Sequence, residues 1–127
     1  MDLTGTWRLL KETAADATGG TPPTLFGPSP FGVATFKSKG RVILATTDGR
    51  SDVPGGSRML MAYSGRYEFD GDTLTAYLDV ATDPALVAIP QVRRVQFIDR
   101  DTVVLSPPAG FMGASGVRRE YTWARIS

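Results

Sequence analysis

Apolar and polar residues alternate along most of this chain with the period of two that is typical of a half-buried β-strand. The clearest stretch is residues 60–69, which runs into Asp70-Gly71, and Asp-Gly is a strong signal for a tight hairpin turn. The alternation resumes in residues 73–80. These two runs therefore predict one long antiparallel hairpin.

The same pattern recurs on both sides of this hairpin. Further strands are predicted over residues 5–11, 31–36, 41–47, 91–98, 102–106 and 117–126. Short turns separate most neighbouring strands, and no segment shows sustained helical periodicity. The sequence thus predicts an all-β protein in which consecutive strands form hairpins.

Three stretches rich in Gly, Pro and small residues interrupt the alternation, at residues 13–30, 47–57 and 107–116. Prolines also break the pattern in residues 81–90. The first and third of these loops contain side chains that are too apolar for fully solvated loops, and so does the start of the strand that follows the first loop. These residues, which we expect to fold over a ligand, are Leu25, Phe26, Phe31, Phe111 and Met112.

A succession of hairpins favours a closed antiparallel up-and-down β-barrel over a two-sheet sandwich, because an immunoglobulin-type sandwich needs Greek-key crossovers. We expect about eight to ten strands, and a barrel of that size has room for one small ligand. The 127 residues, 42% of them hydrophobic, suffice for one domain over residues 1–127 with its own core.

Composition narrows the possible functions. The formal net charge is +1 and the longest basic runs are pairs such as Arg93-Arg94, so the basic stripe of a nucleic-acid binder is missing. No apolar run reaches membrane-spanning length, and the first residues do not resemble a signal peptide. We therefore predict a cytoplasmic protein without a nucleic-acid or membrane partner, and the oligomeric state stays open, with a homodimer as one option.

The chain contains neither Cys nor His. This excludes disulfides, thiolate nucleophiles, His-containing dyads and metal sites built from Cys or His. No dinucleotide fingerprint or phosphate loop is present either. We expect no metal and no cofactor, so any chemistry falls to phenols, guanidiniums, hydroxyls and carboxylates.

Parity along the strands predicts which side chains face the barrel interior. If Trp7 points inward, the same face of the central hairpin offers Tyr63 and Tyr67, paired with either the Leu74 or the Tyr77 face of the next strand. Two later strands place an Arg on an otherwise apolar face, Arg93 beside Val95 and Phe97, and Arg119 beside Tyr121 and Trp123. An inward guanidinium must find a carboxylate, a carbonyl or a ligand oxygen.

These residues form the candidate site. The candidates for proton transfer or oxyanion support are Tyr63, Tyr77, Arg93, Arg119 and Tyr121, with Asp79 as a further possible inward carboxylate. The candidates for ligand contact are Phe26, Phe31, Tyr67, Phe97, Phe111 and Met112. Trp7 and Arg125 are expected to stack as a structural cation–π pair at the closed end.

Several motifs resemble those of bacterial lipocalin-like domain proteins. Gly5-Thr6-Trp7 resembles the lipocalin Gly-x-Trp motif, and Trp123-Ala124-Arg125 resembles the closing strand whose Arg packs over that Trp. The run over residues 62–72, followed by Gln91-Val92-Arg93-Arg94, is more specific. The resemblance implies a calyx-shaped barrel that binds an apolar or amphipathic small molecule.

Two functions from different classes remain. Members similar to this family include a few cofactor-free isomerases or cyclases of natural-product pathways, which implies that the tyrosines and arginines act on a substrate held by the barrel. The alternative is a non-catalytic binding or carrier protein, which needs only a cavity and one or two polar anchors. A third reading, a solidly packed interaction module, is disfavoured by the small inward residues Gly65 and Ala76.

Overall fold

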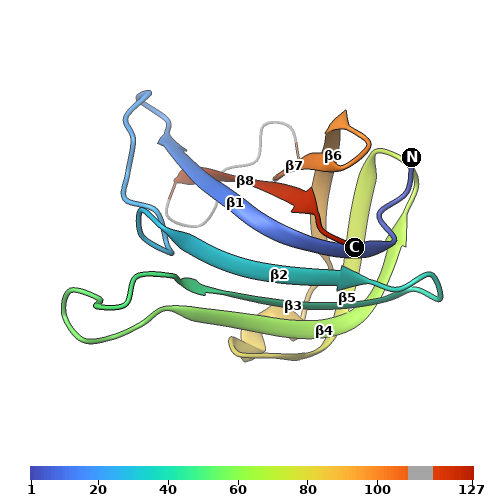
Figure 1. Ribbon diagram of the computed structural model, residues 1–127, viewed down its shortest axis with the longest axis horizontal. Coiled ribbons are helices and arrows are strands. Elements are labelled where there is room, and N and C mark those ends of the chain that lie inside the picture. The colour runs from blue at the N-terminus through green and yellow to red at the C-terminus, as the bar shows by residue number, and fades with distance from the viewer. Residues whose placement is uncertain (109–115) are drawn as a thin grey trace.

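The computed structural model describes residues 1–108 and 116–127, and this part of the chain contains eight strands and one short 3-10 helix (Figure 1). The elements are β1 (Gly5–Asp16), β2 (Pro30–Phe36), β3 (Arg41–Asp48), β4 (Leu60–Phe69), β5 (Thr73–Ala81), η1 (Pro84–Val87), β6 (Gln91–Asp99), β7 (Thr102–Ser106) and β8 (Val117–Arg125). Neighbours in sequence pair antiparallel, and β1 also pairs with β8. The predicted closed up-and-down barrel is confirmed. The described helix is not long and apolar enough to cross a membrane.

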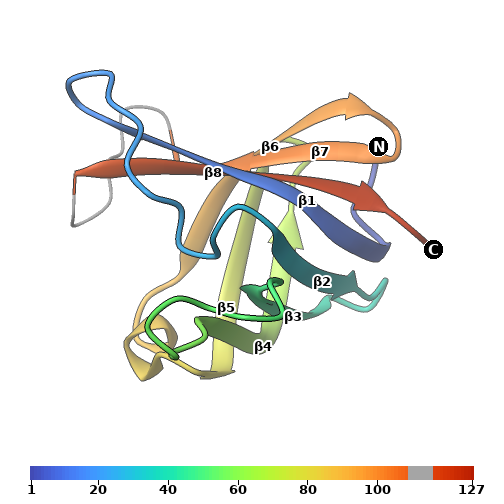
Figure 2. The same cartoon turned by 60° about the vertical axis from the view of Figure 1, so that its left-hand side comes forward.

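The two ends of the barrel differ. Both termini lie at one end, here called the closed end, together with the β6–β7 turn (Figures 1 and 2). The loop over residues 17–29 and the helix η1 lie at the other end, here called the loop end (Figures 1 and 2). The N-terminal segment plugs the closed end, because Leu3 is only 3% exposed and belongs to the hydrophobic core.

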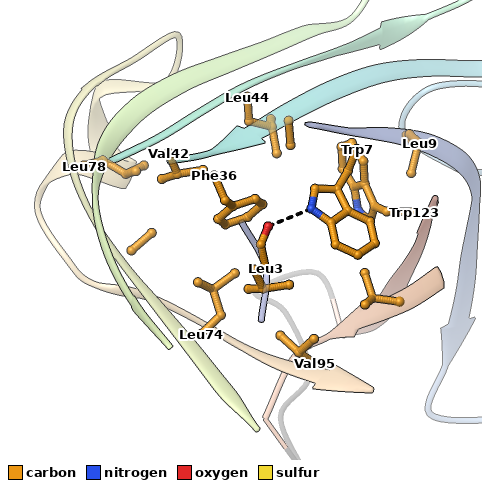
Figure 3. Close-up of a cluster of buried hydrophobic side chains, with 13 residues drawn as sticks. Leu3, Trp7, Leu9, Phe36, Val42, Leu44, Leu74, Leu78, Val95 and Trp123 are labelled. Carbon is orange, nitrogen blue, oxygen red and sulfur yellow. Dashed lines mark hydrogen bonds between the residues drawn. The ribbon is translucent and has the colours of Figure 1, made fainter. Parts of the chain in front are cut away.

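Trp7 is the centre of the closed end. It is 1% exposed, and its indole Nε1 donates a hydrogen bond of 2.8 Å to the carbonyl oxygen of Leu3 (Figure 3). Trp123 of β8 lies beside it in the same cluster (Figure 3). The guanidinium of Arg125 lies 4.3 Å from the Trp7 ring centroid, which confirms the predicted cation–π pair.

Arg125 also ties three chain segments together. Its side chain donates to the backbone carbonyls of Asp2 and Thr4 and to that of Arg100 in the β6–β7 turn. It forms an ion pair with Asp101 at 2.9 Å. The stacking residue of the closed end is therefore also the clamp that holds the N-terminus against the barrel.

The first strand is longer than predicted and irregular. It continues to Asp16 because it pairs with β8 as far as Val117, whereas the sequence predicted a loop from residue 13. Its register with β8 shifts between Leu9 and Lys11. This irregularity inverts the parity, so that the buried positions change from Trp7 and Leu9 to Glu12 and Ala14.

Parity left open whether the Leu74 face or the Tyr77 face of β5 points into the barrel, and the structure decides this. Leu74, Ala76 and Leu78 are buried, so Tyr77 faces outward. Gly65 is explained by a close approach rather than by cavity space, because a Cβ there would lie 2.3 Å from the carbonyl oxygen of Tyr77. Gly65 is therefore required by backbone contact and is no sign of an unfilled interior, contrary to the sequence-based expectation, whereas Ala76 does line the cavity.

Candidate functional site

The barrel encloses a cavity of about 270 Å³. Its walls are largely apolar, and near the closed end they include Leu3, Trp7, Phe36, Val42 and Trp123. The volume is close to the lower limit of about 300 Å³ that is usual for small-molecule sites. The interior is therefore not packed solid, and its size suits a small ligand.

Six polar side chains of the described residues line the cavity nearer the loop end: Thr46, whose hydroxyl donates to the Met61 carbonyl, and five that are called the polar belt here. The five of the polar belt are Tyr63 of β4, Gln91 and Arg93 of β6, and Arg119 and Tyr121 of β8. Four of them were predicted site residues, and three non-adjacent strands place them around the cavity because alternate residues of each strand face inward. The cavity thus has an apolar floor and a polar belt above it.

Arg119 is compensated by a carboxylate. Its Nη1 lies 3.1 Å from Oε2 of Glu12, whose side chain is 0% exposed, and it also donates to the carbonyl oxygen of Pro23. The same carboxylate accepts hydrogen bonds from the backbone N–H groups of Leu25 and Phe26 at 3.0 and 3.2 Å. Glu12 therefore holds Arg119 and anchors the loop over residues 17–29.

Arg93 has no such partner. Its Nη1 donates a 2.7 Å hydrogen bond to the carbonyl oxygen of Val92, and it forms no ion pair within residues 1–108 and 116–127. The remaining residues, 109–115, include no Asp or Glu in their sequence. The polar belt consequently contains one guanidinium whose charge the chain leaves without a carboxylate.

The two phenols of the belt are held in their neutral form. Burial raises the pKa of Tyr63, and the nearby charge of Arg93 opposes this only in part. Burial also raises the pKa of Tyr121, reinforced by the negative charge of Glu12 and opposed by Arg119 and Arg93. Both hydroxyls therefore serve as hydrogen-bond donors or proton donors at neutral pH, and neither is a ready base.

Two segments cover the loop end. In the loop over residues 17–29, Phe26 is 2% exposed and lies 6.4 Å from the Tyr121 ring, and Leu25 also lines the cavity. Leu86 of η1 lines it as well, and the amide of Gln91 donates to the Leu86 carbonyl at 3.1 Å. Phe26, which was predicted to contact a ligand, thus lies at the cavity wall.

Not every predicted site residue reaches the cavity. Tyr77 is 36% exposed, and Arg66 stacks 4.2 Å from its ring centroid on the outer surface. Phe31 is 47% exposed and packs against Arg8 outside the barrel. Asp79 also faces outward, where it pairs with Arg41 at 2.7 Å. Their expected places inside the cavity were wrong, because the register of each strand puts these side chains on the convex face.

Tyr67 and Phe97 face inward but belong to the core near the closed end. The Tyr67 hydroxyl donates to the Lys37 carbonyl at 2.9 Å, and its ring packs edge-on against Phe36. Phe97 packs against Phe69 with ring centroids 6.3 Å apart. Neither is part of the cavity wall. Phe111 and Met112 lie outside the described residues.

The loop predicted over residues 47–57 was expected to rim the cavity, but none of its residues lines it. This loop is organised by the buried Asp48, which binds Arg50 at 2.6 Å and whose carbonyl oxygen accepts from Arg58. The Arg50 guanidinium lowers the pKa of Asp48 to about 2. The polar contacts of Asp48 are therefore structural.

Sequence reasoning missed Glu12 and Leu86. Nothing in the alternation reveals the irregularity at residue 10 that turns Glu12 inward, and a parity count from Trp7 places it outside. Leu86 lies in a segment read only as a break in the pattern. Gln91 was detectable, since it shares the parity of Arg93 on the same strand.

A closed eight-stranded meander around a largely apolar cavity defines the fold as a calyx-type barrel. A family model described as a lipocalin-like domain matches residues 4–126, and the chain therefore belongs to the lipocalin-like domain family. A search of curated proteins gave no match.

Proposed function

We propose that this protein binds an amphipathic small molecule in its barrel cavity, with the apolar part against the floor and the polar part at the polar belt. The observation that carries the proposal is the cavity of about 270 Å³, apolar around Trp7 and Trp123 and polar around Arg93 and Tyr121. Membership of the lipocalin-like family supports it. A cytoplasmic location and a single domain over residues 1–127 stay predictions.

Binding without catalysis is favoured because a base that faces the cavity is lacking among the described residues. The predicted carboxylate, Asp79, pairs with Arg41 on the outer face. Glu12 is buried behind Arg119, where its oxygens accept hydrogen bonds from Arg119, Leu25 and Phe26. The groups at the cavity wall are donors suited to hold an acceptor.

The proposal is tested with N-phenyl-1-naphthylamine, an uncharged apolar probe whose fluorescence rises in an apolar site. We expect saturable binding and quenching of the two Trp residues, Trp7 and Trp123, which both line the cavity. Ala76→Leu fills cavity space and should weaken binding, whereas Ala15→Leu, an added side chain on the exposed face of β1, should not. Equal binding by both variants, or no binding by the wild type, contradicts the proposal.

A cofactor-free isomerase or cyclase is the second candidate, and one observation favours it. Arg93 lies close enough to Tyr63 and Tyr121 to affect the pKa of both phenols, so an enolate-like oxygen placed there would meet a cation and two neutral donors. For an enzyme, Arg93→Met and Tyr121→Phe should abolish turnover while apolar ligands still bind. For a binding protein, the same changes alter affinity alone.

A further inference from the structure

The charges at the cavity wall indicate the charge of the ligand, in addition to its amphipathic character. Arg119 is neutralised by Glu12 at 3.1 Å, whereas Arg93 has no ion-pair partner in the described part of the chain, and residues 109–115 supply no acidic side chain. The polar belt thus carries one uncompensated positive charge. We infer that the ligand is an amphipathic monoanion, an organic acid whose carboxylate or equivalent acidic oxygen pairs with Arg93. This inference rests on the proposed function.

The loss of water from Arg93 on ligand binding makes its charge selective for an anionic ligand. A ligand that fills the cavity displaces water from the Arg93 guanidinium, and a buried cation without a counter-charge is strongly disfavoured. An acid offsets that cost through short, charge-assisted hydrogen bonds, and a guanidinium suits a carboxylate because two parallel N–H groups meet its two oxygens. Arg93 uses Nη1 for the Val92 carbonyl and keeps further N–H donors for a ligand. A neutral ligand of the same shape offsets less of this cost, because uncharged hydrogen bonds are weaker than charge-assisted ones.

The surrounding groups agree with an acceptor-bearing ligand. Tyr63 and Tyr121 stay protonated beside Arg93, because burial raises the pKa of both hydroxyls. The Tyr63 hydroxyl is able to donate to an anionic oxygen, whereas the Tyr121 hydroxyl also interacts with the Glu12 carboxylate. The unused donor capacity of Arg93 therefore calls for acceptor atoms from the ligand.

One negative charge is expected rather than two. A second acidic group would have to compete with Glu12 for Arg119, and that carboxylate is held by two backbone N–H groups as well as by the guanidinium. Displacing it would also release the loop that carries Phe26. The built-in pair leaves Arg93 as the one guanidinium of the polar belt ready for a ligand.

The test compares three probes that share a ten-carbon chain and differ in charge: decanoate, decanol and decylammonium. Each displaces N-phenyl-1-naphthylamine from the wild type at neutral pH, below the concentrations at which the amphiphiles form micelles. Decanoate should bind about 10- to 100-fold more tightly than decanol, as for a hydrogen-bonded charge pair, and decylammonium should bind more weakly still.

Variants at Arg93 assign the preference to this residue. Arg93→Met should reduce the ratio of decanoate to decanol affinity to nearly one, and Arg93→Lys, which keeps the charge, should retain part of it. Arg94→Met is the matched control, because Arg94 is the next residue along β6 and its side chain is 58% exposed. That variant should keep the wild-type ratio.

The outcomes separate the two proposals. Equal affinity of the wild type for decanoate and decanol, or an unchanged ratio in Arg93→Met, overturns the acidic ligand and leaves the binding function standing. If the wild type binds neither N-phenyl-1-naphthylamine nor any ten-carbon probe, the binding function itself fails.

Discussion

Replacing Glu12 by Gln tests the buried carboxylate on which the loop end depends. The substitution keeps the size of the side chain but removes its charge, and it turns one acceptor oxygen into an NH₂ donor. In the native protein both oxygens are used, by Arg119 at 3.1 Å and by the backbone N–H groups of Leu25 and Phe26. In Glu12→Gln, at least one of these donors faces another donor.

The cost follows from burial. Removing one partner of a buried ion pair costs about 3 to 5 kcal/mol, because the other charge is left without compensation. The Arg119 side chain is 21% exposed and keeps its hydrogen bond to the Pro23 carbonyl, so we expect the lower value, about 3 kcal/mol. With a urea dependence of about 1 to 3 kcal/mol per M, the unfolding midpoint should fall by about 1 to 3 M.

Urea unfolding followed by Trp fluorescence measures this shift. Glu120→Gln is the matched control, since Glu120 lies on β8 next to Arg119 but is 43% exposed and 3.6 Å from Arg118, and its loss should cost less than about 1 kcal/mol. Chymotrypsin should also cleave Glu12→Gln faster after Phe26, which is 2% exposed in the native protein. Equal midpoints for the two Gln variants would refute the role of Glu12.

Three further outcomes are expected. Trp7→Ala should lower the free energy of unfolding by about 3 to 5 kcal/mol, as for a large buried aromatic, and a wild-type melting temperature would contradict this. Asp48 has its pKa lowered to about 2 by Arg50, so its contribution to stability is complete above its usual value of 3.8 and is lost as the pH falls through about 2. Unfolding midpoints measured from pH 5 downward should therefore converge for the wild type and Asp48→Asn, and parallel curves would be inconsistent with the lowered pKa. Because the pKa values of Tyr63 and Tyr121 are raised, their phenolate absorbance should appear only together with alkaline unfolding, and the Phe variants should lose that part of the signal.

Much of the site was visible in the sequence because inward residues repeat every second position along a regular strand. Arg93 was recognised as an inward cation from its neighbours Val95 and Phe97, and Tyr63 from its place in the central hairpin. The cavity wall does contain Arg93 and Tyr63. The Trp7–Arg125 stack was recognised from its two motifs.

Parity failed where pairing is irregular or where two faces were equally plausible. Tyr77 was placed inside, but Leu74 and Ala76 are the buried residues of β5. A strand with apolar residues on both faces is assigned only by the neighbours it pairs with. Tyr77 consequently stacks with Arg66 at the surface.

By itself, the sequence determined the class of the fold and most of the inward pattern, because the alternation of residues and the turn signals are local properties of the chain. Only the tertiary structure decided that Glu12 faces inward, because the irregularity near residue 10 exists only in the pairing of β1 with β8. It also decided the charge of the cavity. Whether Arg93 or Arg119 has a carboxylate partner depends on which distant strands and loops meet, and Glu12 and Arg119 are 107 residues apart in the chain.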